Sequence, residues 1–564
     1  MPARKSNPKA AHLTVLTDFP GAAAEKISIA DSGDRVFFAA PLGGSPRGMW
    51  FHFKTLGGDG SPITFVLTNR EQMLGRRDYH RTVPVYRRDD GDWQRVNPVE
   101  CYTDEVYHHV TGEPGRSAAP ADCPPGSFVF RVPCGPGVTE IAYCYPCTLE
   151  MIDAAIKRWQ ADRNVTILTV CRTPHRRAMR VVRIGKPARG RKVVWVLARQ
   201  HAGETPGGFA AEGFIDAVLS SAAWARKLRR KAVVFVCPAV DVDGVAEGLY
   251  GKDRGPADFN RDWSANPVRR EIAALRDAMD CSRRECAAAR DVGKIAVVVD
   301  LHAPGPGAVS FPVPPHPAWA GRSAWQRAWR LAMAIERFAG YRTPVRWANG
   351  YADHIDWSPP ALTCRTASAF HAADGLADFS MSLELTYHWQ VTGALATPDD
   401  WRRIGLAVAR AVEAVACKDR PGTARPAAPD PPFYLSQSHG WLNVPRQCTA
   451  HVNGDRISMQ AEGPQAYAAI LFAEPIPVKR GRFLATVSIG RTTRGRSPMH
   501  RLVFFFRDGV FTGEIFEQPG ELAGQDEITW HGPVHRKFPA DSARVAVALR
   551  NWVGTITLGR PKAE

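Results

Sequence analysis

Two strand-like apolar runs of the chain each end close to residues that can bind a metal ion. The run Val194–Ala198 is followed by His201 and Glu204 in an H-x-x-E arrangement, and the run Val297–Val299 is followed by His302. Zinc accepts two nitrogens and a carboxylate while leaving a position for water. H-x-x-E alone occurs by chance in many proteins, but two strands that each deliver a histidine favour a metal site.

The segment Asp258–Trp263 carries groups that could bind a substrate or support a metal ligand. Arg261, with Asn260 beside it, could hold a carboxylate, because a guanidinium matches a carboxylate in fork geometry. Asp258 could orient a metal-bound histidine from behind. The alternative is an ordinary Asx turn before the helix predicted near Val268.

A single carboxylate stands among apolar residues in Phe379–Leu385, an alternating strand pattern. A partly buried glutamate has a raised pKa and can act as a general base on an activated water. Glu384 is therefore a candidate base, and a salt-bridged strand glutamate is the alternative.

The elements that must position these residues follow an α/β pattern from about residue 164. Apolar strand-like runs at 193–198, 233–236 and 295–300 alternate with helical patterns at 208–220 and 268–289. Continuous apolar strands between helices predict a mixed, largely parallel sheet that helices flank. Open α/β sheets place their sites at the carboxyl ends of the strands, where His201 and His302 fall.

The rest of the chain divides by composition. We predict a flexible tail at 1–24, an antiparallel N-terminal β-sandwich at 25–148, the α/β domain at 149–418, a Pro- and Ala-rich linker at 419–432 and a C-terminal β-sandwich at 433–564. No catalytic cluster is evident in the last of these. A structural role is favoured there over binding a partner or carbohydrate, or covering the site.

The formal net charge is +17 over 564 residues, which raises the question of an anionic partner. The basic clusters are short and scattered, and neither a nucleic-acid motif nor an aromatic-interleaved basic stripe accompanies them. They are interpreted as solvated faces, with an acidic peptide as the second interpretation. We predict no nucleic-acid partner and no membrane partner, because no window approaches the ~18 apolar residues of a span. The oligomeric state is not indicated.

The N-terminal stretch has early charges and no continuous apolar core, so it does not resemble a signal peptide. The 12 cysteines have no framework spacing, and the lone C-x-x-C of Cys144 and Cys147 is interpreted as core packing. The pattern predicts a cytoplasmic protein with free thiols.

Taken together, the four segments resemble the M14 zinc carboxypeptidases: H-x-x-E, an N-R pair, a histidine about a hundred residues after the first, and a glutamate on a late strand. The closer resemblance is to the cytosolic carboxypeptidase branch. Five stretches carry it: Ala198–Thr205 ("ARxHPGES"), Pro238–Val245 ("PMLNPDGV"), Trp50–Phe53 ("WFYF"), Thr64–Asn69 ("RFNIIN") and Ala142–Thr148 ("AYxYPYT"). The resemblance covers roughly residues 25 to 415, and that branch carries a small β-sandwich before its peptidase domain.

The resemblance implies a role for each candidate. Three residues would bind one Zn²⁺ ion: His201, Glu204 and His302. Glu384 would take a proton from the attacking water and pass it to the leaving amine. Asn260 and Arg261 would grip the free terminal carboxylate of a peptide or protein, which makes the enzyme exo-acting.

Three departures from the family pattern accompany the resemblance. The arginine that stabilises the oxyanion has no clean counterpart, and Arg254 is the candidate, with Lys252 behind it. Tyr351 is the candidate for the mobile tyrosine, in a shorter loop. Ala303–Gly305 replace the "GHS" that follows the second histidine in cytosolic relatives, which alters the adjacent pocket wall.

The predicted function is zinc-dependent removal of C-terminal residues. The cytosolic branch is associated with removing glutamates, and the basic charge is compatible with this. One alternative is a zinc deacylase or amidohydrolase of N-acyl amino acids, which the N-terminal sandwich argues against. The other is an inactive binding protein on the same fold, which retention of all the ligands and Glu384 argues against.

Overall fold

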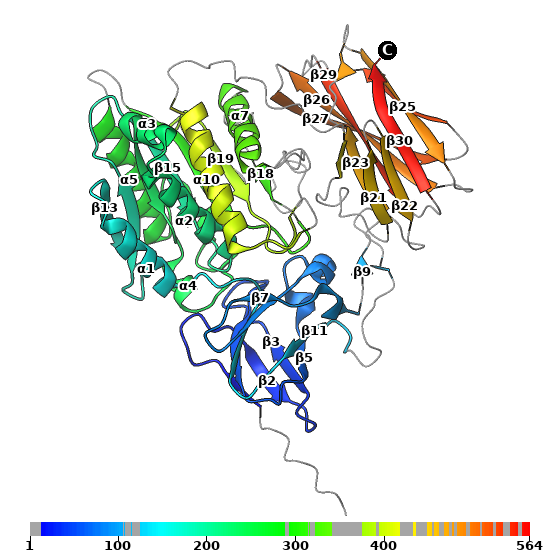
Figure 1. Cartoon of the computed structure of the whole chain (residues 1–564). Coiled ribbons are helices and arrows are strands. Elements are labelled where there is room, and N and C mark those ends of the chain that lie inside the picture. Colours follow the sequence, from blue (N-terminus) through cyan, green and yellow to red (C-terminus); the bar gives the residue numbers. More distant parts are fainter. Residues whose placement is uncertain are drawn as a thin grey trace, which may run out of the picture.

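Three bodies of secondary structure follow one another along the chain in the computed structural model (Figure 1). The structure describes residues 13–104, 106–107, 114–115, 124–287, 293–308, 310–313, 315, 322–340, 375–390, 394–417, 433–435, 448–453, 456–461, 467–472, 476–478, 482–491, 497–507, 510–522, 526–533, 542–550 and 555–563.

The N-terminal body consists of two five-stranded sheets, with a short β9–β10 ribbon (Val106–Tyr107, Pro114–Gly115). One sheet has the order β1 (Thr14–Leu16), β4 (His52–Leu56), β12 (Val138–Ala142), β6 (Val85–Arg88), β7 (Gln94–Arg95). The other has the order β2 (Glu25–Ile29), β3 (Arg35–Ala39), β5 (Pro62–Leu67), β11 (Phe128–Pro133), β8 (Cys101–Thr103). The pairing is antiparallel except between β3 and β5. The predicted tail is too long, because Thr14–Leu16 pairs with β4.

The central body is a seven-stranded mixed sheet that helices flank. Its order is β13 (Val165–Arg172), β14 (Ala178–Ile184), β16 (Ala232–Cys237), β15 (Lys192–Ala198), β17 (Ile295–His302), β19 (Ser380–Glu384), β18 (Phe311–Val313). The helices are α1 (Leu149–Gln160), α2 (Thr205–Leu219), α3 (Ala223–Lys231), α4 (Val242–Ala246), α5 (Arg270–Cys286), α7 (Arg322–Ala339) and α10 (Pro398–Val415). The predicted fold class is confirmed.

The four central strands, β16, β15, β17 and β19, are mutually parallel, and the remaining pairs are antiparallel. Every residue of β16, β17 and β19 is buried. The apolar, β-branched sequence of β16 and of Ile295–Val299 in β17 suits strands that are covered on both faces, whereas β19 is buried although it carries two serines and Glu384. The parallel arrangement brings the carboxyl ends of β15, β17 and β19 to one edge, where the candidate residues lie.

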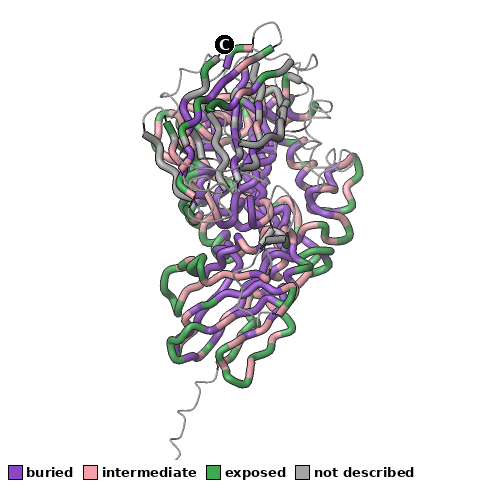
Figure 2. Tube along the Cα trace, turned by 90° about the vertical axis from the view of Figure 1, so that its right-hand side faces the viewer, coloured by how far each residue is buried: buried purple, intermediate pink, exposed green. Residues whose placement is uncertain are grey.

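The N-terminal and central bodies share one hydrophobic core. A single cluster of buried residues runs from the sandwich, including Phe51 and Tyr143, into the central sheet, including Trp195 and Tyr387. Figure 2 shows these buried stretches in purple through both bodies. The two bodies therefore pack as one folding unit rather than as loosely tethered domains.

The C-terminal body consists of two antiparallel sheets with a separate buried cluster around Trp530. One sheet contains β20 (Phe433–Leu435), β23 (Tyr467–Phe472), β29 (Ser542–Arg550), β26 (Ser497–Arg507) and β27 (Val510–Leu522), with β24 (Ile476–Pro477) beside β29. The other contains β21 (Cys448–Asn453), β22 (Arg456–Ala461), β30 (Thr555–Ala563), β25 (Arg482–Arg491) and β28 (Glu527–Pro533). The linker predicted at 419–432 lies outside the described residues. None of the described helices has the length and apolar character needed to cross a bilayer.

Candidate metal centre

The metal centre lies at the carboxyl edge of the parallel strands. His201 and Glu204 occupy the turn between β15 and α2, His302 ends β17, and Glu384 ends β19. The turn after β15 is tight: Arg199 takes a left-handed conformation with φ of 60°. Its guanidinium holds the turn, with Nε donating to the carbonyl of Ala202 at 2.7 Å. A strained residue that its surroundings hold in place is a common feature of functional turns.

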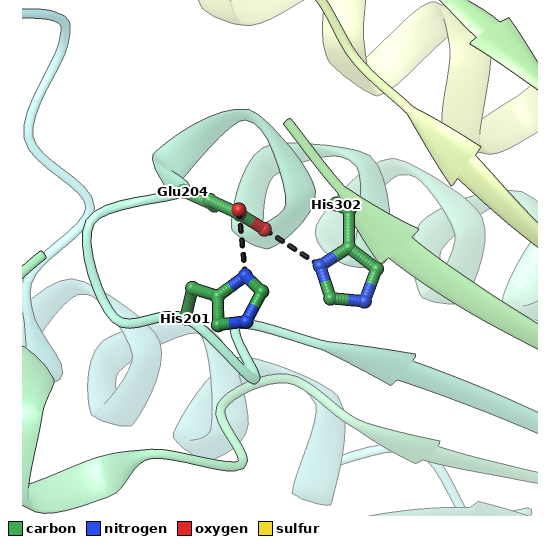
Figure 3. Close-up of side chains that lie close together, drawn as sticks. All are labelled: His201, Glu204 and His302. Atoms are coloured by element: carbon green, nitrogen blue, oxygen red, sulfur yellow. Dashed lines mark hydrogen bonds and ion pairs between the residues drawn. The ribbon is translucent and has the colours of Figure 1, made fainter. Parts of the chain in front are cut away.

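The side chains of His201, Glu204 and His302 converge, as Figure 3 shows. Oε1 of Glu204 lies 2.7 Å from Nδ1 of His201, and Oε2 lies 2.7 Å from Nδ1 of His302. One ligand atom from each residue lies within 4.8 Å of the others, and all three residues are buried. The sequence-based prediction that these residues meet is confirmed.

Each histidine is held from behind by a buried carboxylate. Nε2 of His201 lies 3.1 Å from Oδ2 of Asp258, and Nε2 of His302 lies 2.9 Å from Oδ2 of Asp300. A carboxylate that accepts from Nε2 fixes the tautomer and leaves the Nδ1 lone pair free for an ion. Both imidazoles therefore point Nδ1 towards Glu204 and the centre.

The electrostatics of the pocket suit a cation. The two histidines hold the pKa of Glu204 far below its usual range, although burial acts in the opposite direction. Burial also opposes the ionised form of Asp258, but His201 outweighs it and keeps the pKa of Asp258 well below its usual value. For His302 burial favours the neutral ring, yet Asp300 and Glu204 raise its pKa well above the ordinary value. Buried carboxylates around two imidazoles require positive charge, which a divalent ion supplies.

Glu384 lies at the same edge of the sheet. It pairs in register with His302, and the amide of Leu385 donates to the carbonyl of His302 at 2.8 Å. Its Oε2 atom is buried and has no hydrogen-bond partner among the described residues. Burial raises the pKa of this carboxyl, with the charge of Glu204 acting in the same direction. A buried, unpaired carboxylate next to a metal centre has the properties of a general base.

Asn260 and Arg261 lie in the short 3₁₀ helix Phe259–Arg261, for which Asp258 is the N-cap. The Nδ2 atom of Asn260 lies 2.9 Å from Nε2 of His302, so its amide packs directly against a ligand. Nη1 of Arg261 donates to the carbonyl of Asn260 at 2.9 Å, and the side chain is half-buried. Asn260 thus lies directly against the metal centre, and Arg261 follows it in the same short helix.

Arg254 and Lys252, the candidates for stabilising the oxyanion, lie among the described residues, whereas Tyr351 does not. Nη2 of Arg254 donates to Oδ1 of Asp241 at 2.6 Å, which commits part of its guanidinium to that carboxylate. Lys252 is half-buried, and its charge opposes the rise in the pKa of Glu384 that burial causes, which places Lys252 near that carboxylate. Tyr351 lies outside the described residues.

Two supporting residues, Asp300 and Gln200, were not assigned a role from the sequence. Asp300 stands two positions before His302 on a strand, and residues i and i+2 share a face, which is a signal that could have identified it. Gln200 donates from Nε2 to Oδ2 of Asp300 at 2.6 Å and accepts from Trp263 Nε1 at 2.7 Å. No sequence signal marks Gln200, because its role depends on segments brought together by folding.

A second group of possible ligands, His175, Asp243 and Glu247, lies at the surface. Nη1 of Arg177 lies 2.8 Å from Oδ1 of Asp243 and 3.1 Å from Oε1 of Glu247. The one guanidinium is therefore already ion-paired with both carboxylates. The group is an ion-pair network that fastens the β13–β14 hairpin to α4.

The residues at the main centre fit zinc. Two imidazole nitrogens and one carboxylate are the donor set that catalytic zinc sites use with one open position. The carboxylates behind the histidines and the orphaned Oε2 of Glu384 complete an arrangement for metal-assisted hydrolysis. A single ion, held by His201, Glu204 and His302, suits this geometry.

Comparison with known proteins gives matches in the same region. The family model described as zinc carboxypeptidase matches residues 152–291. Cytosolic carboxypeptidase 2 of Xenopus tropicalis is 25% identical over 253 residues, which cover 42% of this chain and 24% of that protein. Cytosolic carboxypeptidase 6 of Mus musculus is 25% identical over 276 residues, which cover 45% of this chain and 47% of that protein. The chain thus spans less than half the length of these curated relatives.

Solved structures share the fold. A metallo-carboxypeptidase from Burkholderia cenocepacia has a TM-score of 0.56 at 19% identity, covering 71% of this chain and 98% of that chain. A metallo-carboxypeptidase from Pseudomonas aeruginosa has a TM-score of 0.56 at 18% identity with the same coverage. The profile match over residues 152–291, this fold and the buried His-Glu-His set together identify a zinc carboxypeptidase domain of the M14 family in this chain, with distant similarity to the cytosolic carboxypeptidases.

Proposed function

We propose that the protein is a zinc-dependent carboxypeptidase that hydrolyses the last peptide bond of a peptide or protein. The observation that carries this proposal is the buried Oε2 atom of Glu384, which has no hydrogen-bond partner among the residues that the structure describes and lies beside His302 at the edge where the His-Glu-His set converges. A structural glutamate in this position would be paired or hydrogen-bonded.

A zinc ion held by His201, Glu204 and His302 would polarise the scissile carbonyl and lower the pKa of the attacking water. Glu384 accepts a proton from the attacking water and then delivers it to the leaving amine nitrogen. Burial raises the pKa of this carboxyl and brings it closer to the working pH. Glu384 can therefore both accept a proton and donate it again. Asp258 and Asp300 keep the two imidazoles in the orientation that metal binding requires.

The free terminal carboxylate of the substrate binds Arg261, with Asn260 beside it. A guanidinium offers two parallel donors to a carboxylate, and its fixed distance from the metal centre selects the last peptide bond. Arg254 and Tyr351 stay proposals for oxyanion stabilisation and substrate contact. Arg254 is the first candidate for the oxyanion, with Lys252 behind it, and Nη2 of Arg254 also donates to Asp241.

Acidic termini are the proposed substrate class, because the chain carries +17 net charge and its relatives are cytosolic carboxypeptidases. The cytoplasm is the proposed location. The described cysteines are free thiols, which agrees with a reducing compartment.

A peptide-library digest read by mass spectrometry tests the function. We expect stepwise loss of C-terminal residues, abolished by a chelator and restored by Zn²⁺, with C-terminal amides resistant. N-acyl amino acids serve as the parallel substrate. Their hydrolysis without peptide trimming would overturn the assignment in favour of a deacylase, and bound zinc without any hydrolysis would favour a binding protein.

The Pseudomonas aeruginosa enzyme was solved in complex with (2-guanidinoethylmercapto)succinic acid, a compound with two carboxyl groups. We expect this compound to inhibit the present protein in competition with peptide. Arg261→Met should weaken that inhibition more than it weakens zinc binding.

A further inference from the structure

Among the residues by which the N-terminal body contacts the segment after Glu384 is Arg95, on the edge strand β7. Its guanidinium makes bonds to both bodies. Nη1 donates to the carbonyl of Val83 in its own body at 2.7 Å. Nη2 donates to the carbonyls of Tyr387 at 2.6 Å and Ala396 at 2.8 Å in the central body.

Arg95 binds the segment that directly follows Glu384 in the chain, which includes Tyr387 and His388. Nη1 of Arg95 also lies 2.9 Å from Nδ1 of His388, and the His388 side chain is fully buried. Burial, with the charges of Arg95 and Arg81 in the same direction, keeps the pKa of His388 well below its ordinary value. The ring is therefore neutral and accepts from Arg95.

The same segment touches the backbone of the metal-binding turns. The hydroxyl of Tyr387 donates to the carbonyl of Gly203, between His201 and Glu204, at 3.3 Å. Gly203 is packed so closely that a Cβ there would lie 3.0 Å from the ring of Tyr250. A displacement of Tyr387 would therefore also displace the turn that carries His201 and Glu204, two of the three zinc ligands.

Arg81 and Tyr143 of the N-terminal body also contact the central body near this segment. Nη1 of Arg81 donates to the carbonyl of Gly307 at 2.6 Å, and Trp389 Nε1 donates to the carbonyl of Arg81 at 2.7 Å. The ring of Tyr143 lies edge-on to His388, with centroids 4.8 Å apart. The N-terminal body thus forms a wall behind the segment that follows the catalytic carboxylate.

We infer that Arg95 is a positioning residue for the catalytic centre: through the carbonyl of Tyr387 and the ring of His388 it fixes both Glu384 and the His201–Glu204 turn. The inference rests on the proposed function for its activity readout. Retention of zinc, which needs no substrate, tests it separately.

The experiment compares Arg95→Lys with Arg87→Lys. Arg87 lies on the neighbouring strand β6 and donates to Glu140 at 2.9 and 2.6 Å within the N-terminal body, so it is the matched control. For Arg95→Lys we expect a kcat reduced about 10- to 100-fold, a KM within about threefold of wild type and faster release of zinc to a chelator. Arg87→Lys should change the melting temperature without these effects. A kcat and a zinc release rate for Arg95→Lys within twofold of wild type would overturn the inference.

Two further measurements test whether Arg95 acts through the segment that follows Glu384. In Arg95→Ala, millimolar methylguanidinium should restore part of kcat and slow zinc release, because it refills the guanidinium site. In a double-mutant cycle, Tyr387→Phe should add little to Arg95→Lys, since both act through the same segment. If the fold reductions in kcat of Arg95→Lys and Tyr387→Phe multiply in the double variant, Arg95 does not act through Tyr387. If Arg95→Lys does not fold, zinc release from Tyr387→Phe at the wild-type rate would overturn the inference, and faster release would support it.

Discussion

Glu384 and His302 are directly paired residues at the ends of two parallel strands, β19 and β17. This register places the Glu384 carboxylate next to His302, whose Nε2 atom is already engaged by Asp300. Within the described part of the chain, Oε2 of Glu384 has no hydrogen-bond partner. The sheet register itself therefore positions the proposed base, Glu384, relative to the metal centre.

Glu384→Gln should separate metal binding from turnover. The amide keeps the shape of the side chain but cannot accept the proton, so we expect full zinc content and a kcat lowered by about 10²- to 10⁴-fold. Metal analysis and peptide kinetics on one preparation give both values. Glu212→Gln, on α2 and ion-paired with Arg402, is the control. A Glu384→Gln enzyme with wild-type kcat would reject the base.

Removing a ligand and removing its supporting carboxylate should have graded effects on zinc. His201→Ala deletes a donor, so the purified protein should contain less than one equivalent of zinc. Asp258→Asn leaves the donor but loosens its orientation, and we expect zinc affinity to fall about 10- to 100-fold. Competition with a chromogenic chelator measures both. Asp399→Asn, whose side chain is 89% exposed, should match wild type. Equal affinity for Asp258→Asn and wild type would contradict the role of Asp258.

Arg261→Lys should affect recognition more than chemistry. A lysine retains the charge but loses the fork, so we expect the KM for peptides with free C-termini to rise about tenfold or more while kcat changes less. The preference for free termini over C-terminal amides should fall in parallel. Arg276→Lys is the control, because its Nη1 donates to the carbonyl of Ala265 on an exposed surface. An unchanged KM would exclude Arg261 from carboxylate binding.

Glu140 should make the N-terminal body sensitive to acid. His52 and Arg87 overcome the effect of burial and lower the pKa of Glu140 from 4.5 to about 2. A lowered pKa in the folded state contributes stability that is present above about pH 4.5 and is lost as the pH falls towards about 2. The shift corresponds to about 3 kcal/mol.

The measurement is denaturant unfolding of Glu140→Gln and wild type across pH. The variant should be less stable at pH 7 by an amount of this order, and the two curves should approach each other below about pH 3. Glu100→Gln, whose side chain is exposed and lies 3.7 Å from Arg131, should track wild type. A stability difference for Glu140→Gln that stays constant between pH 7 and pH 3 would contradict this account.

The sequence predicts the metal ligands well because each is fixed by local order: His201 and Glu204 lie on one turn, and His302 ends an apolar strand. The sheet was also predictable, since its buried strands have a distinctive composition. The contact between Asn260 and His302, and that of Gln200 with Asp300, depend on segments up to 100 residues apart, and no local pattern encodes them. The same holds for Arg95, which resembles any strand arginine until the two bodies are packed together.

The two separate buried clusters have a consequence for how the protein melts. The sandwich and the sheet share one interior, whereas the C-terminal strands have their own around Trp530. Calorimetry should therefore record two heat-absorption peaks, and adding zinc should move only the peak of the larger unit to higher temperature. A fragment cut at the start of α1 would expose the apolar wall it normally shares with the sandwich, and we expect it to aggregate rather than fold.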